Sequence, residues 1–164
     1  MVSKFVLAQK LNRMKNQNFS TTLLVEATPQ QVFEAINNVR GWWSENIDGQ
    51  TDQLQSIFSY HFQDVHRCKM QITTLIPAQK IVWHVLDNHF NFTKAKKEWI
   101  GSDIIFTISE KEGGALLEFT HRGLLPTDEC YQICHESWTN YIQNSLKNLI
   151  LRGTGDPTPA ETLE

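Results

Sequence analysis

The sequence has little of what marks membrane proteins, disulfide scaffolds and nucleic-acid binders. No apolar run in its 164 residues approaches the ~20 residues of a membrane span. Its three cysteines cannot all pair, whereas disulfide frameworks normally use even counts, so we expect a reduced, cytoplasmic protein. The chain has fifteen basic and eighteen acidic residues, so its net charge is negative. General nucleic-acid binding needs a surplus of lysine and arginine. We therefore expect neither a membrane span nor a nucleic-acid partner.

Signatures of nucleophilic catalysis, phosphate binding and metal binding are also missing. There is no GxSxG elbow and no glycine-rich phosphate loop. Cys130 and Cys134 are too far apart for a CxxC redox motif and are expected to pack as small apolar groups. Of the neighbouring His61, His66 and Cys68, the last two share a face in a strand register, but zinc needs three or four converging ligands. We expect no metal site and no cofactor.

The chain length fits one domain that can bury a substantial core. Residues 1–18 contain no acidic residue, and their one short apolar run is too brief for a signal-peptide core, so we expect a solvated, partly helical N-terminal extension. The domain itself is expected over residues 19–153. Residues 154–164 are expected to form a C-terminal tail, because Pro157 and Pro159 cannot continue a helix.

Apolar and polar residues alternate over six segments, which is typical of β-strands with one buried face. Short turns, such as those predicted at 76–79 and 113–114, join successive segments and favour antiparallel pairing. The polar stretches 48–53 and 88–98 are expected to be loops. The six predicted strands are residues 19–26, 58–63, 67–72, 80–86, 102–109 and 115–122.

Two short helices are predicted after the first strand. Thr28 suits an N-cap, Pro29 the first helical position, and Gln31 a capping box, so a helix is expected to run to about Asn37. Residues 41–44 are expected to form a second short helix or a turn that carries two tryptophans.

A long C-terminal helix is predicted from a cap at Thr127 to Arg152, with Gly153 at its end. Its apolar stripe is expected to cover the apolar face of the sheet. The expected fold is therefore α+β, with a six-stranded curved antiparallel sheet wrapped around this helix. A bent sheet and a straight helix diverge at their ends, and pockets form in such openings.

Five segments of the chain together carry a resemblance to a known superfamily. They are ATPQQVFEAINNVRGWWSENIDG, IVWHV, EWIGSDIIF, LLEFTHRGLLP and ECYQICHESWTNYIQNSL. The chain from about residue 19 to 155 resembles the START-like, helix-grip (SRPBCC) superfamily. More narrowly, it resembles the bacterial branch named after the activator of the heat-shock-protein-ninety ATPase. The resemblance implies a helix-grip domain with an internal, largely apolar cavity, but a fold does not determine a function.

Inward-facing residues of the sheet and the last helix are the candidates for lining such a cavity. Several carry polar atoms that need a partner when buried, which a ligand or water in a cavity would supply. The alternative is a filled core in which these atoms bond to one another. Trp42 and Trp43 are expected to plug the space between helix and sheet, or else to roof the pocket entrance. The candidate ligand-binding residues are Phe58, Tyr60, Met70, Trp83, Trp99, Phe106, Phe119, His121, Trp138 and Tyr141.

His121 is the first of these candidates to consider, because a histidine in the inward register can bond a ligand or act as an acid or base near neutral pH. The alternative is a satisfied core histidine that donates to a backbone carbonyl or a nearby tyrosine. Arg122 is out of that register and is expected to pair with a surface acid such as Glu118 or Asp103.

The leading functional hypothesis is binding of an apolar small molecule (lipid, aromatic or polyketide-like) without a cofactor. A second is an enzyme of the polyketide cyclase/aromatase type, as some superfamily members are, with His121, Tyr141 or Glu98 as the acid–base group. A third is a co-chaperone-like interaction protein with a chaperone partner. It would use Phe90 and Phe92, expected to protrude from a loop, as anchors.

Overall fold

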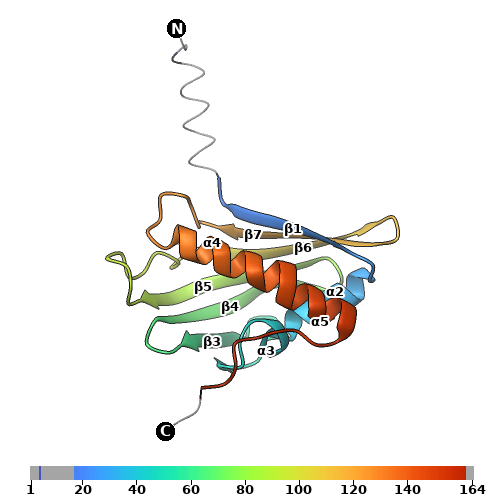
Figure 1. The fold of residues 1–164 in the computed structure, drawn as a ribbon, viewed down its shortest axis with the longest axis horizontal. Coiled ribbons are helices and arrows are strands. Elements are labelled where there is room, and N and C mark those ends of the chain that lie inside the picture. The colour runs from blue at the N-terminus through green and yellow to red at the C-terminus, as the bar shows by residue number, and fades with distance from the viewer. Residues whose placement is uncertain (1–3, 5–16, 162–164) are drawn as a thin grey trace.

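The structure is a computed structural model that describes Lys4 and residues 17–161. Most of the expected N-terminal extension and the last three residues of the expected tail lie outside the described residues. Figure 1 shows a curved sheet with a long C-terminal helical rod lying across one face. This is the α+β arrangement that the sequence predicts.

All strands belong to one antiparallel sheet in the order β1-β7-β6-β5-β4-β3-β2. Burial alternates along the strands, as in β7, where Leu117, Phe119 and His121 are buried and face the rod. The apolar face of the sheet therefore forms the core together with the rod. The strands are β1 (Phe19–Val25), β2 (Ile47–Asp48), β3 (Ile57–Phe62), β4 (His66–Ile76), β5 (Lys80–Phe90), β6 (Asp103–Lys111) and β7 (Gly114–Arg122).

The sheet has seven strands, so the prediction of six was wrong. The additional strand, β2, pairs with β3, with Ile47 opposite Tyr60 and Asp48 opposite Ser59. Two residues are too few to show an alternating pattern, so β2 exists only because β3 lies alongside it. Strand β5 also extends through Phe90, into a segment that was expected to be a loop.

Two short helices follow β1, as predicted. In α2 (Pro29–Asn37), the Gln31 N–H donates to the Thr28 hydroxyl at 3.1 Å, and the Thr28 N–H donates to the Gln31 side chain at 2.8 Å. This is the predicted capping box. Helix α3 (Val39–Trp42) follows directly. The indole N–H of Trp42 donates at 3.0 Å to a carbonyl of α2, which fixes this side chain in the core.

The rod consists of three consecutive helical segments. They are α4 (Tyr131–Asn140), the π-helical η1 (Tyr141–Leu146) and α5 (Lys147–Arg152). The rod ends at Gly153, whose φ of 78° is the left-handed conformation that glycine adopts without strain. Helix α4 begins later than the predicted cap at Thr127, because the Glu98 carboxylate, from another loop, accepts the backbone N–H groups of Glu129 and Cys130.

Residues 155–161, here called the strap, turn back from the rod and lie against the segment that follows α3. The Asp156 N–H donates to the Ser145 hydroxyl at 2.7 Å. Thr158 forms a parallel bridge with Ser44. A side chain at Gly155 would bring a Cβ within 2.3 Å of the Gly41 carbonyl oxygen, so this approach requires glycine.

Candidate functional site

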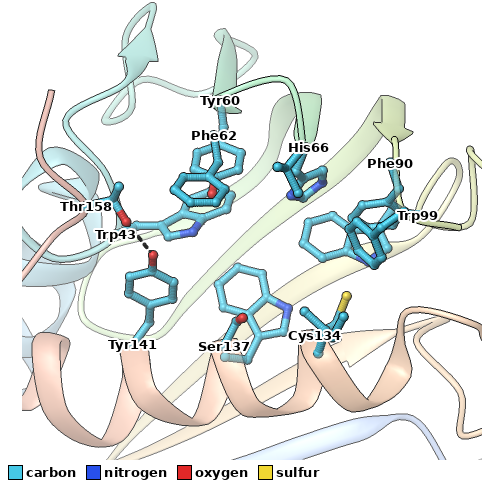
Figure 2. A pocket seen from close by; sticks show the side chains of 14 residues that line it. Trp43, Tyr60, Phe62, His66, Phe90, Trp99, Cys134, Ser137, Tyr141 and Thr158 are labelled. Carbon is cyan, nitrogen blue, oxygen red and sulfur yellow. Dashed lines mark hydrogen bonds between the residues drawn. The ribbon is translucent and has the colours of Figure 1, made fainter. Parts of the chain in front are cut away.

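A cavity of about 270 Å³ lies between the rod, the strap and the ends of β3, β4 and β5. Figure 2 shows side chains from all of these elements pointing into one space. None of the described residues that line it is Asp, Glu, Lys or Arg. The cavity is therefore apolar and has no fixed charge in its wall. The lining residues labelled in Figure 2 are Trp43, Tyr60, Phe62, His66, Phe90, Trp99, Cys134, Ser137, Tyr141 and Thr158.

Of the ten predicted binding residues, Tyr60, Trp99, Trp138 and Tyr141 line this cavity. The other six are fully buried beside it and do not line it. Their side chains fill the centre of the space between sheet and rod, so the open volume lies toward one end of the rod. These six are Phe58, Met70, Trp83, Phe106, Phe119 and His121.

Stacked aromatic rings form much of the cavity wall. Trp43 stacks on Tyr60 with ring centroids 4.3 Å apart and an interplanar angle of 12°. Trp99 stacks on Trp138 at 5.8 Å and 15°, and Trp43 lies 5.2 Å from Trp138. Trp42, by contrast, stacks in the core and does not reach the cavity. Trp42 therefore fills space in the core, whereas Trp43 forms part of the cavity wall.

His121 is a satisfied core histidine. The Trp138 indole N–H donates to its Nδ1 at 3.2 Å, so the ring proton lies on Nε2, which donates to the Ser102 hydroxyl at 2.8 Å. The Ser102 hydroxyl in turn donates to the Trp99 carbonyl at 2.5 Å. Burial, the largest cause, lowers the pKa of His121 to about 3. The hydrogen-bonded chain therefore fixes Trp99 and Trp138, which both line the cavity, and leaves no nitrogen of His121 for a ligand.

His66 lines the cavity and was not among the predicted binding residues. It is 9% exposed, with its ring centroid 4.3 Å from that of Phe90 and 4.6 Å from that of Trp99. Its Nε2 lies 2.7 Å from Asn88 Oδ1. Burial lowers the pKa of His66 to about 4, although the bond to Asn88 opposes this shift. The shared register of His66 and Cys68 was the sequence signal that could have identified it.

The two predicted tyrosines present their hydroxyls differently. The Tyr141 hydroxyl lies 2.6 Å from the Thr158 hydroxyl and joins the rod to the strap. The Tyr60 hydroxyl makes no hydrogen bond within residues 17–161, and the residue is 7% exposed. Burial, together with nearby groups that also disfavour ionisation, raises the pKa of Tyr60, so its phenol stays protonated.

The strap closes one side of the cavity through bonds to the segment after α3 and to the β3–β4 turn. The Asn46 side chain donates to a strap carbonyl at 3.1 Å and accepts the Glu161 N–H at 2.9 Å. The Glu161 carboxylate accepts the Gln63 N–H and lies 3.3 Å from Nε2 of His61. Because Thr158 lines the cavity, these bonds also hold part of its wall.

Two exposed apolar side chains, Phe92 and Ile133, mark the mouth of the cavity. They are 40% and 53% exposed, and both line it. Phe90, which was expected to protrude as a partner anchor with Phe92, is 1% exposed. That prediction was wrong because β5 extends through Phe90 and places it in the inner face of the sheet.

The other predicted polar groups have structural partners. Glu98 caps α4 at distances of 2.7 and 3.0 Å from the two backbone nitrogens. Arg122 pairs with Asp103, as predicted, and Asp103 also lies 2.7 Å from Nδ1 of His84. This cluster is on the outer face of the sheet, away from the cavity.

All three cysteines are free and buried. Cys134 lines the cavity, and both a hydrogen bond with Cys130 and burial raise the pKa of its thiol, so the group stays protonated. In the part of the chain that the structure describes, no three His, Cys, Asp or Glu side chains are placed to hold a metal ion. Nor does any helix there have the length and apolar character needed to cross a membrane.

A family model described as "Activator of Hsp90 ATPase homolog 1-like protein" matches residues 26–150. Among solved structures, the chain is similar to Aha1 of Colwellia psychrerythraea, solved as a dimer in solution, with 23% identity and a TM-score of 0.68 over 84% of this chain and 98% of that one. No curated protein matches the sequence.

Two further structures share the fold at lower identity. One is CalU16 of Micromonospora echinospora, with 15% identity and a TM-score of 0.58 over 84% of this chain and 75% of that one. The other is DynU16, a protein in the dynemicin biosynthetic locus, with 12% identity and a TM-score of 0.59 over 83% of this chain and 48% of that one. At these identities, the likeness shows the fold alone.

Proposed function

The chain belongs to the family of Activator of Hsp90 ATPase homolog 1-like proteins, and from that premise we propose that it binds an uncharged apolar or aromatic small molecule. The observation that carries the proposal is the cavity between sheet and rod. Its walls are stacked aromatic rings, and no ionised side chain is among the described residues that line it. Such a site favours flat, apolar molecules and disfavours charged ones.

The size of the cavity limits the ligand. An apolar cavity of ~150 Å³ can hold one benzene ring. A volume of about 270 Å³ therefore has room for roughly two fused rings. The mouth between Phe92 and Ile133 provides an apolar path from solvent.

Burial of ligand surface supplies the affinity. Apolar area removed from water contributes roughly 25 cal/mol per Å², so a ligand that buries ~200 Å² gains about 5 kcal/mol from its own surface. The cavity wall loses exposed apolar area as well, and the loss of ligand freedom offsets part of the total. We expect dissociation constants on the order of 1 µM, equivalent to about 8 kcal/mol.

The enzymatic and co-chaperone hypotheses have less support from the geometry. Both nitrogens of His121 are bonded within the core, the Tyr141 hydroxyl is bonded to Thr158, and Glu98 caps α4. Each candidate acid–base group therefore has a structural task. Of the two candidate anchors for a protein partner, only Phe92 is exposed, and it lies at the cavity mouth.

Calorimetric titration with naphthalene tests the proposal, because this uncharged probe has the two fused rings for which the cavity has room. The matched variants are Ser137→Trp and Gln132→Trp. Both positions are exposed on α4, but only Ser137 lines the cavity. We expect the wild type and Gln132→Trp to bind the probe equally and Ser137→Trp to bind at least tenfold more weakly, because its indole fills the cavity.

Equal binding by Ser137→Trp and the wild type would place the probe elsewhere and contradict the proposal. Circular dichroism of both variants would show whether the fold is retained. Native mass spectrometry of the protein purified from its own host would then identify any small molecule that it retains.

A further inference from the structure

Several polar atoms of the cavity wall, including the buried indole N–H of Trp99, have no hydrogen-bond partner within residues 17–161, and two of them lie on neighbouring side chains of β3 and β4. These two are the Tyr60 hydroxyl and His66 Nδ1. The side chains that carry them are more than nine-tenths buried, and their rings meet edge-on with centroids 5.3 Å apart. Figure 2 shows both side chains on the sheet side of the cavity. A ligand that fills the cavity shields both atoms from water, and an atom left unpaired is then costly, so a ligand that pairs with both gains selectivity.

Asn88 determines which nitrogen of His66 is free. Asn88 Nδ2 donates to the Lys96 carbonyl at 3.4 Å, which orients the amide so that its Oδ1 accepts from His66. His66 Nε2 must therefore carry the ring proton, and Nδ1 is left as an acceptor. The ring stays neutral at pH 7, because burial lowers the pKa of His66 to about 4.

Tyr60 supplies the complementary donor. Its ring is held against Trp43, and its strand is paired with β2 on one side and β4 on the other, so the hydroxyl has a fixed position. Burial keeps this hydroxyl protonated by raising its pKa. The wall thus offers one neutral donor and one neutral acceptor on two side chains whose ring centroids lie 5.3 Å apart.

From this pair we infer that the cavity selects ligands that carry a hydroxyl group, a phenol or an alcohol, on an uncharged aromatic or apolar frame. The ligand hydroxyl donates its proton to His66 Nδ1, and its oxygen accepts from the Tyr60 hydroxyl. The inference rests on the proposed function, because it specifies the chemistry of the ligand for the same cavity.

Other polar groups on a ligand cannot pair with both the Tyr60 hydroxyl and His66 Nδ1. A ketone or ether oxygen accepts from Tyr60 but leaves His66 Nδ1 unpaired. A carboxylate faces the lone pair of Nδ1 and meets no lysine or arginine among the described lining residues, and an ammonium meets no carboxylate there. A hydroxyl both donates and accepts through one oxygen, which matches two atoms on adjacent side chains.

Calorimetric titration with three probes of the same frame tests the inference: naphthalene, 2-methoxynaphthalene and 2-naphthol. We expect 2-naphthol to bind the wild type at least about tenfold more tightly than 2-methoxynaphthalene, because the ether loses the bond to His66. This comparison needs no variant, so it stands even if a substitution impairs folding.

Three variants then assign the preference to its residues. His66→Phe and Tyr60→Phe keep the ring contacts but remove the acceptor and the donor. We expect each to reduce the preference for 2-naphthol to about threefold or less while naphthalene binding is retained. His89→Phe is the control, because His89 lies on the outer face of β5, away from the cavity. It should keep the wild-type preference.

The outcomes separate the two proposals. If naphthalene binds but 2-naphthol gains nothing over 2-methoxynaphthalene, the hydroxyl inference is overturned and the proposed function stands. If the preference persists unchanged in both His66→Phe and Tyr60→Phe, the assignment to these residues is overturned. If none of the three probes binds, the proposed function fails and the inference fails with it.

Discussion

Acidification from pH 7 to pH 5 should destabilise this protein through two buried histidines, His121 and His66. In the folded protein, burial lowers the pKa of His121 to about 3 and of His66 to about 4, from an ordinary value of 6.5. Below pH 6.5 the unfolded chain therefore binds protons that the folded protein does not. The stability that these neutral rings contribute is complete above pH 6.5 and is lost as the pH falls toward their folded pKa values.

The magnitude follows from the linkage between protonation and unfolding. Each histidine that protonates only in the unfolded state lowers the free energy of unfolding by ~1.4 kcal/mol per pH unit below its unfolded pKa. Between pH 7 and pH 5 this amounts to about 2 kcal/mol for each ring and about 4 kcal/mol for both. For a domain of this size, 4 kcal/mol corresponds to a fall in melting temperature of roughly 8–16 °C.

Urea unfolding of the wild type and His121→Gln at both pH values isolates the contribution of His121. Glutamine can accept from Trp138 and donate to Ser102 but does not titrate, so His121→Gln should lose about 2 kcal/mol less than the wild type between pH 7 and pH 5. Ser102→Ala is the control. It should be less stable at both pH values by about 1–3 kcal/mol, because a buried bond is lost, yet keep the wild-type dependence on pH. An equal loss in His121→Gln and the wild type would refute the reasoning.

Two further predictions concern contacts that hold the cavity wall. Glu98→Ala should lower the free energy of unfolding by about 1–2 kcal/mol in urea titrations, because the first turn of α4 loses its cap. Glu98→Gln, which keeps one acceptor oxygen, should lose less, and an undiminished stability of Glu98→Ala would contradict the cap. Thr158→Val should cost about 0.5–1.5 kcal/mol through the lost bond to Tyr141, and Tyr141→Phe should cost about the same. If the double variant loses no more free energy of unfolding than either single variant, the two residues act through this bond. Fully additive losses would contradict that reading.

Much of the fold could be predicted from local patterns, because the physics that forms these elements is local. Alternation in segments such as 115–122 determines which side chains share a face, and the capping box at Thr28 is completed within four residues. The elements that were missed depend on distant partners. Strand β2 exists because Tyr60 and Ser59 lie opposite it, and α4 begins where Glu98 caps it.

The residues of the candidate site were likewise predictable only where local patterns determine their position. All ten predicted residues are buried or line the cavity. Sequence periodicity placed seven of them in the inner register of the strands and Trp138 and Tyr141 on the inner stripe of the last helix. It could not distinguish Trp83, which fills the core, from Trp99, which lines the cavity. Nor did it single out His66, whose free Nδ1 depends on Asn88 from the neighbouring strand.

The sequence alone thus determined the direction in which side chains point within the strands and helices that it predicted, because that direction is set by the backbone period of each element. Only the tertiary structure decided where space remains between them. An open volume depends on how side chains from the sheet, the rod and the strap together fill the same region. No single segment of the sequence contains this information.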